Sequence, residues 1–93
     1  SIASLAQNIQ IKGKVIDAET KKSLEAATVL VKGQNQSART DASGLFTINN
    51  APAKASIVVS YVGYKTKTVT ASAGDLVVAL EKADETLNEA SLR

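Results

Sequence analysis

Four acidic side chains are the first candidates for chemistry in this sequence, and they lie in three separate polar stretches. Asp17 and Glu19 lie in one stretch, Asp41 lies in a second and Asp75 in a third. Acid–base catalysis needs two carboxylates at a defined separation, one of them in a perturbed environment. No feature of the sequence brings these acids together, so they read as turn-forming residues and solvated charges.

The sequence offers few residues that could bind a metal ion or act as an activated nucleophile. The chain contains no His and no Cys, which excludes Ser-His and Cys-His nucleophile pairs and zinc sites built on cysteine. The stretches DASG and DAET do not match a calcium loop, which needs clustered acids and a turn glycine. We therefore predict no enzymatic activity, no catalytic residue, no metal site and no cofactor.

Two tyrosines, Tyr61 and Tyr64, flank Gly63 in the segment SYVGYKTKTV. Such a pair could stack on a sugar ring. Tyrosines in small domains more often fill the core with the ring and leave the hydroxyl at its rim. Both interpretations stay open at the level of the sequence, and the structural one is favoured.

Size and charge narrow the class of protein further. The chain has 93 residues, 11 basic and 9 acidic side chains, and a net charge of +2, so one small domain is expected. The lysines are spread along the chain and do not alternate with aromatic residues, which argues against nucleic-acid binding. No apolar run approaches the roughly 20 residues that cross a bilayer, so the isolated domain is not expected to span a membrane.

Short strands separated by turns dominate the pattern. Strands are expected within residues 9–16, 26–33, 34–44, 45–49, 56–62, 64–71 and 75–81. Seven strands with a turn signal every eight to twelve residues predict an all-β fold, an antiparallel β-sandwich. Segment 26–33 is mostly apolar and predicts a strand buried on both sides or nearly so, whereas segment 49–55, with Pro52, predicts a loop.

Within these strands, alternation selects the residues that face the core. The expected inward residues are Ile9, Ile11, Val15, Phe46, Ile48, Leu76, Val78 and Leu80. Gly13 falls on the same apolar face, where a glycine marks either a bulge or a close approach. Asp41 and Gly44 have the spacing favoured in a type I turn, in which the Asp side chain accepts from backbone N–H groups.

The two ends of the chain differ from the middle. We expect residues 1–8 to form a flexible N-terminal segment, either a signal-peptide remnant or a tag, and residues 9–81 to form the sandwich. Residues 82–93 carry three of the acids and lack an apolar stripe. They are expected to form an acidic, extended tail.

The ordered motifs resemble those of the carboxypeptidase-regulatory-like domain, a transthyretin-like (prealbumin-like) Greek-key β-sandwich. The resemblance covers about residues 9–81 and includes G-x-V-x-D, a small pair before V-x-V, T-D-x-x-G-x-F-x-I and S-x-x-G-Y. It implies that the matching residues are elements of the fold. They include Gly13, Asp17, Asp41, Gly44, Phe46, Gly63 and Tyr64.

The chain also resembles the N-terminal extension of TonB-dependent outer-membrane transporters of the starch-utilisation type. This implies an accessory domain at the periplasmic face of the outer membrane, in a chain that continues into a plug and a barrel and carries a nutrient, with a glycan expected. The tail resembles the segment that leads into the TonB box, with Leu87, Asn88 and Glu89 at matching positions. Residues 90–93 depart from the box pattern. The implied partner is a TonB-type energy-coupling protein or another periplasmic protein.

A second interpretation remains open. The same family fold occurs as a spacer or a glycan-binding module of secreted or surface multidomain proteins. The two interpretations differ in the sequence expected beyond Arg93: a plug and a long alternating barrel pattern, or catalytic and adhesive modules.

Overall fold

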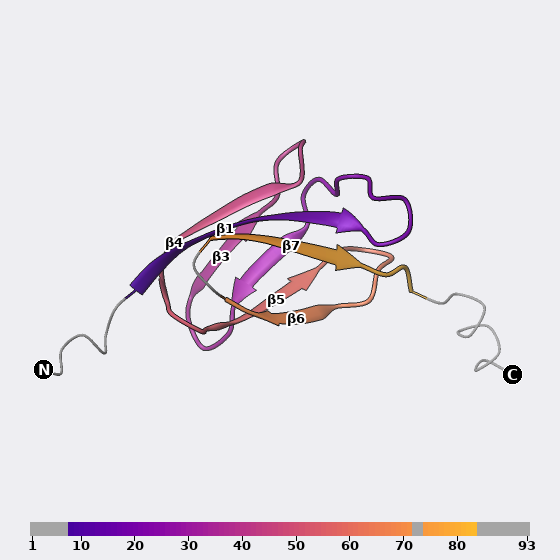
Figure 1. The fold of residues 1–93 in the computed structure, drawn as a ribbon. Coiled ribbons are helices and arrows are strands. Elements are labelled where there is room, and N and C mark those ends of the chain that lie inside the picture. Colours follow the sequence, from indigo (N-terminus) through magenta and orange to yellow (C-terminus); the bar gives the residue numbers. More distant parts are fainter. Residues whose placement is uncertain (1–7, 72–73, 84–93) are drawn as a thin grey trace, which may run out of the picture.

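The computed structural model describes residues 8–71 and 74–83, and these residues form two β-sheets packed face to face (Figure 1). The prediction of an all-β sandwich of seven strands is confirmed. The strands are β1 (Asn8–Asp17), β2 (Thr28–Val31), β3 (Gln36–Arg39), β4 (Leu45–Pro52), β5 (Ser56–Ser60), β6 (Lys67–Thr70) and β7 (Asp75–Leu80).

One sheet has three strands in the order β4-β1-β7, and the other has four in the order β3-β2-β5-β6. Every neighbouring pair is antiparallel except β1 and β7, which run parallel. The three-stranded sheet is therefore mixed, where the sequence predicted only antiparallel pairing. Parallel neighbours need a long crossover connection, and here the connection includes the whole four-stranded sheet.

The core lies between the sheets and follows the alternation in the sequence. Eight aliphatic side chains are almost completely buried: Ile11, Val15, Val29, Val31, Ile57, Val59, Val78 and Leu80. Strand β2 differs from its prediction because Leu30 is 42% exposed. Its neighbours in sequence point into the core, and among the described residues no element covers the outer face of the four-stranded sheet.

Gly13 marks a close approach. It pairs with Phe46 across β1 and β4, and a Cβ atom at position 13 would lie 2.5 Å from Cζ of Phe46. The absent side chain therefore makes room for the aromatic ring, which is 4% exposed. The irregularity in this pair of strands lies elsewhere, between Ile9 and Ile11.

The connection from β3 to β4 carries the chain from one sheet to the other through the turn at Asp41–Gly44. The Asp41 side chain accepts hydrogen bonds from the backbone N–H groups of Ser43 (2.9 Å) and Leu45 (3.0 Å). Gly44 has φ of 77°, and its carbonyl accepts from the N–H of Val15 at 2.8 Å. The turn is thereby fixed directly to β1.

Thr40, the first residue of the T-D-x-x-G-x-F-x-I motif, holds the same crossing together from within, a role that its place in the motif did not indicate. Its buried hydroxyl donates to the Leu24 carbonyl at 2.5 Å and accepts from the N–H of Ala27 at 2.8 Å. A single side chain thus satisfies two backbone groups of the segment that leads into β2.

The prediction of a loop at 49–55 is wrong for its first half, because β4 continues to Pro52. Proline is tolerated there since β4 is an edge strand and its outer side needs no donor. The predicted flexible segments 1–8 and 82–93 lie mostly outside the described residues. Asn8 belongs to β1, and both Lys82 and Ala83 contact the 63–64 segment.

We expect Gly44→Ala to destabilise the domain more than the matched change Gly33→Ala. Both glycines have positive φ, 77° and 84°, so the backbone cost of alanine, about 1–2 kcal/mol, is shared. At position 44 the new methyl group would also lie 2.8 Å from the Val15 carbonyl, whereas nothing lies within 4 Å at position 33. Overpacking should add about 1–3 kcal/mol to the loss of unfolding free energy.

Urea unfolding of the two variants measures this difference. Equal losses would show that the close contact with β1 is relieved at no cost.

Candidate functional site

A buried carboxylate lies at the end of the sandwich where β1 and β7 finish, and it accepts three hydrogen bonds. Asp17, the last residue of β1, is only 3% exposed. One carboxylate oxygen accepts from the backbone N–H groups of Glu19 (2.7 Å) and Thr20 (2.8 Å), and the other accepts from the Tyr64 hydroxyl at 2.5 Å. This carboxylate joins two loops that are far apart in sequence.

The chain leaves the sandwich at the same place. The Lys65 N–H donates to the Glu81 carbonyl at 2.8 Å, the Ala83 N–H donates to the Gly63 carbonyl at 2.9 Å, and Tyr64 forms an antiparallel bridge with Lys82. We call residues 63–65, residues 81–83 and Asp17 the exit clamp. It holds the chain in an extended conformation beyond the last strand.

The two tyrosines form part of this structure. Their ring centroids lie 5.5 Å apart with a tilt of 57°, and both rings are half-buried against the core. The Tyr64 N–H donates to the Tyr61 carbonyl at 3.0 Å, which closes the turn around Gly63. The Tyr64 hydroxyl is engaged by Asp17, so the structural interpretation accounts for this residue. The tip of the turn, Val62, is 87% exposed.

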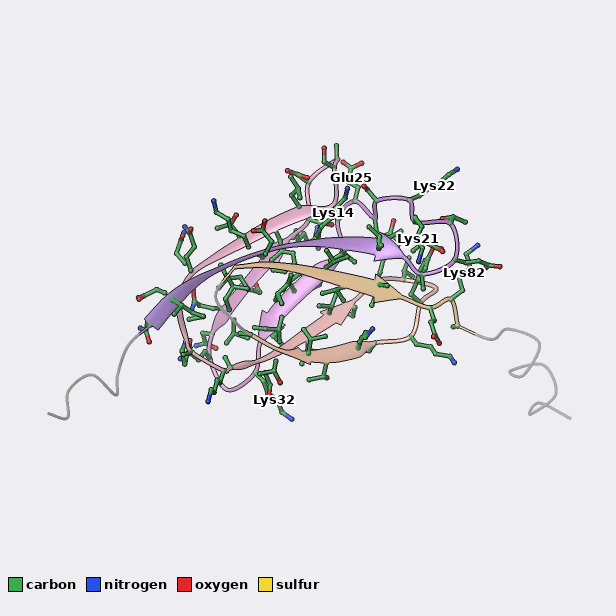
Figure 2. The ribbon with its side chains drawn as sticks, viewed as in Figure 1. Lys14, Lys21, Lys22, Glu25, Lys32 and Lys82 are labelled. Atoms are coloured by element: carbon green, nitrogen blue, oxygen red, sulfur yellow. The ribbon has the colours of Figure 1, made fainter. Side chains whose placement is uncertain are left out.

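The hydrogen bonds of the exit clamp favour the ionised form of the Asp17 carboxyl group. The hydrogen bond from Tyr64 and those from the backbone of Thr20 and Glu19 lower the pKa of Asp17 to about 2, with a smaller contribution from Lys82. The same hydrogen bond, together with burial, raises the pKa of Tyr64 to about 12. Figure 2 shows Lys82 at this end of the sandwich, where Lys21 and Lys22 also lie. At neutral pH the pair is an ionised acceptor and a protonated donor, and neither group is poised to transfer a proton.

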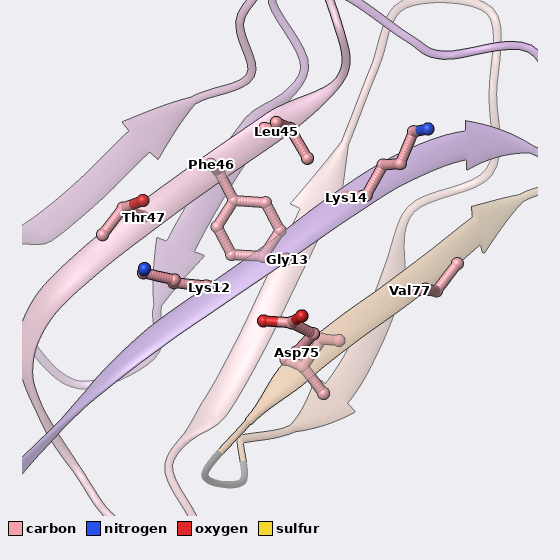
Figure 3. Close-up of a pocket in the computed structure, with 9 residues that line it drawn as sticks. Lys12, Gly13, Lys14, Leu45, Phe46, Thr47, Asp75 and Val77 are labelled. Carbon is pink, nitrogen blue, oxygen red and sulfur yellow. The ribbon is translucent and has the colours of Figure 1, made fainter.

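A shallow groove of about 490 Å³ lies over the three-stranded sheet. Its walls are side chains that point away from the sheet in two rows across the strands, and its middle is the Gly13–Phe46 contact (Figure 3). The rows, taken from the strand register, are Thr47–Lys12–Asp75 and Leu45–Lys14–Val77. One acid and two lysines in an open groove do not form a catalytic pair.

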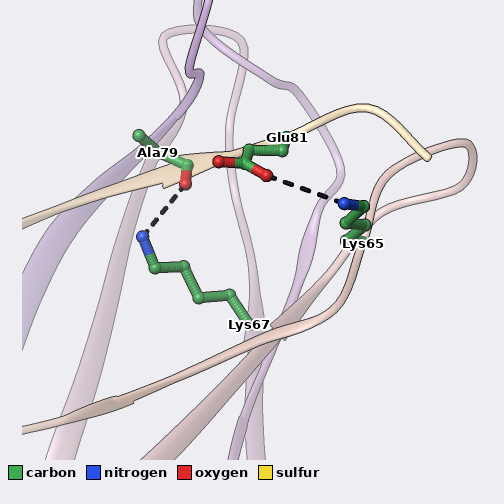
Figure 4. Close-up of polar contacts among 4 residues, drawn as sticks. All are labelled: Lys65, Lys67, Ala79 and Glu81. Atoms are coloured by element: carbon green, nitrogen blue, oxygen red, sulfur yellow. Dashed lines mark hydrogen bonds and ion pairs between the residues drawn. The ribbon is translucent and has the colours of Figure 1, made fainter. Parts of the chain in front are cut away.

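Side chains of β6 and of the segment before it reach the free edge of β7 (Figure 4). The Lys67 ammonium donates to the Ala79 carbonyl at 3.3 Å, and the Lys65 ammonium lies 3.8 Å from a carboxylate oxygen of Glu81. The ion pair is exposed and contributes little to stability. The Lys67 ammonium thus occupies one backbone acceptor of β7, which is an outer strand of its sheet.

Among the described residues, the predicted turn-forming acids Asp17, Asp41 and Asp75 are held by different parts of the fold. Asp17 is held in the exit clamp, Asp41 caps its turn and Asp75 begins β7. Within residues 8–71 and 74–83, no group of three or more His, Cys, Asp or Glu side chains could hold a metal ion. The same residues include no helix long and apolar enough to cross a membrane. The predicted partner-binding residues Leu87, Asn88 and Glu89 lie outside the described part of the chain.

Comparison with known proteins gives three findings. The model of the CarboxypepD_reg-like domain family matches residues 11–91. Over 66 residues the chain is 39% identical to "TonB-dependent receptor P26" of Formosa agariphila, a match that covers 71% of this chain and 7% of the relative. The chain therefore spans less than a tenth of the curated relative that it matches.

The third finding is a likeness in fold. Two crystal structures of interface mutants of a type II cohesin–X-dockerin complex from Acetivibrio cellulolyticus each contain a similar chain. The TM-scores are 0.61 and 0.63, with 19% and 18% identity, over 77% and 82% of this chain and 56% and 59% of the other. The likeness supports the β-sandwich architecture.

The Asp17–Tyr64 hydrogen bond predicts the acid branch of the stability profile. Because the folded-state pKa of Asp17 is lowered from 3.8 to about 2, its stabilising contribution is complete above pH 4 and is lost as pH falls toward 2. In Tyr64→Phe the main cause of the lowered pKa is removed. We expect this variant to be less stable at pH 7 and to lose less stability than the parent between pH 4 and pH 2.

Urea unfolding at several pH values tests this, with Tyr61→Phe as the matched control. Among the described residues no hydrogen bond involves the Tyr61 hydroxyl, so its removal should leave the acid slope unchanged. Parallel pH profiles for the parent and Tyr64→Phe would contradict the role assigned to this bond.

Proposed function

Because the chain belongs to the CarboxypepD_reg-like domain family, we propose that it is a non-catalytic accessory domain of a TonB-dependent outer-membrane transporter. The observation that carries this proposal is the 39% identity with part of a protein named as a TonB-dependent receptor. The matched region is 7% of that relative, as expected for one module of a long chain. We place the domain at the periplasmic face of the outer membrane, in a transporter for a nutrient such as a glycan.

The proposed absence of catalysis rests on how the reactive side chains are used. Asp17, Asp41, Thr40 and Tyr64 each make hydrogen bonds that hold a turn or a crossing between the sheets. A general acid or base must be free to exchange a proton with its substrate. These groups are instead engaged in hydrogen bonds that hold the fold together.

The proposed partner contact is the tail beyond the exit clamp. Residues 81–83 are held as an extended segment at a defined point of the sandwich, so the residues after them start from a fixed position. We propose that Leu87, Asn88 and Glu89 add as a strand to the sheet edge of a TonB-type energy-coupling protein. Strand addition takes its affinity from backbone hydrogen bonds, while alternate side chains supply specificity.

Titration of the nitrogen-15-labelled chain with the periplasmic C-terminal domain of a TonB-type protein tests this contact. We expect amide shifts confined to residues 83–90, because the added strand involves the tail and leaves the sandwich as it was. Leu87→Ala should weaken these shifts, since it removes the apolar side chain of the proposed motif.

The matched control is Leu92→Ala, which removes the same side chain from the part of the tail that departs from the box pattern. It should bind like the parent. Shifts spread over one face of the sandwich would make the folded module the docking surface. No shifts at millimolar partner would contradict direct coupling and favour the spacer interpretation.

A further inference from the structure

The strands nearest the two ends of the described chain lie side by side. β1 begins at Asn8, β7 ends at Leu80, and the two are paired in parallel from Lys12–Asp75 to Asp17–Leu80. Because they are parallel, the chain enters at one end of this pair and leaves at the other, as Figure 1 shows. Tension between the two ends of the chain would therefore pull β1 and β7 past each other along their length.

The direction of such a load decides how the hydrogen bonds fail. When two paired strands slide in opposite directions, all the bonds of the ladder are strained together and must break nearly at once. When strands are pulled apart sideways, the bonds break one after another from one end. The even spacing of the bonds in a parallel ladder shares the sliding load over the whole contact.

The surroundings of β1 and β7 strengthen this arrangement. β1 is the central strand of its sheet and is paired with β4 on its other side. Past the end of the ladder, the Ala18 N–H donates to the Leu80 carbonyl at 2.8 Å. A load arriving at Ala83 first meets the exit clamp, where the Tyr64–Asp17 hydrogen bond transmits it to the end of β1.

We propose that this domain has a mechanical function: it is a load-bearing link that stays folded under tension applied between its two ends. The β1–β7 ladder is the element that resists the load, and the exit clamp joins the outgoing chain to it. This inference goes beyond the proposed function and does not depend on it, because it concerns the response of the fold to force and requires no particular partner.

Single-molecule force spectroscopy on the full chain tests the proposal by changing only the direction of pulling. The sequence contains no Cys, so two introduced cysteines define the attachment points. Ser1→Cys with Arg93→Cys loads the ends. Lys12→Cys with Lys32→Cys, both at exposed positions, loads the domain across its two sheets.

At the same loading rate we expect end-to-end pulling to need a peak force at least about twofold higher than pulling across the sheets, because the ladder bonds are loaded together. Unfolding should occur in one step. The extended Asn8–Leu80 segment is roughly 240–260 Å long at about 3.3–3.6 Å per residue, and that step should release this length less the distance that the folded segment already spans. Equal forces in the two directions, or a low-force release of one strand before the main event, would overturn the proposal.

Two core variants give a second, independent test. Val78 lies in β7 and Val59 in β5, and both are essentially fully buried, so Val→Ala at either position removes the same atoms. We expect Val78→Ala to lower the end-to-end peak force and Val59→Ala to leave it nearly unchanged at matched loss of equilibrium stability. An equal or larger drop for Val59→Ala would show that resistance comes from general stability and not from the β1–β7 ladder.

Discussion

The fold depends on β1, which is hydrogen-bonded to a neighbouring strand along each edge and buries the side chains of one face in the core. As the middle strand of a three-stranded sheet, it pairs with β4 and β7 and places Ile11 and Val15 in the core. Two irregular parts of the fold are also bonded to β1. Gly44 accepts from the N–H of Val15 at the turn between the sheets, and Asp17 at its end organises the exit clamp. Buried backbone groups need partners, and around β1 the partners come from segments that are distant in sequence.

Most of the fold could be predicted from the sequence because its signals are local. Alternation located the strands and their core faces, and the spacing of Asp41 and Gly44 favoured the turn that the structure contains. Gly13 on an apolar face indicated either a bulge or a close approach, and only the position of Phe46 distinguishes the two. The apolar residues of β2 predicted burial on both sides, but the exposure of Leu30 depends on whether another element covers the sheet.

The exit clamp could not be predicted because it joins residues that no local pattern relates. Asp17 and Tyr64 are 47 positions apart, and each has an ordinary local explanation, as a turn former and as a core aromatic. The parallel pairing of β1 and β7 has the same origin. A strand's sequence states which face is buried but does not identify its neighbour or the neighbour's direction. The family resemblance included both Asp17 and Tyr64 without indicating that they meet.

The exit clamp also determines which part of the domain responds to events in the chain beyond it. Without the exit clamp, the end of β7 would be the end of an edge strand. In the described part of the chain, β1 pairs with β7 on one side, and the Lys67 ammonium donates to the Ala79 carbonyl on the other. With the exit clamp, Ala83 is connected through Tyr64 and Asp17 to the central strand. A contact or a force at Ala83 therefore acts on the most extensively bonded element of the sandwich and not on its periphery. Because the Tyr64–Asp17 hydrogen bond makes this connection, the core and the outgoing chain are joined by the fold itself.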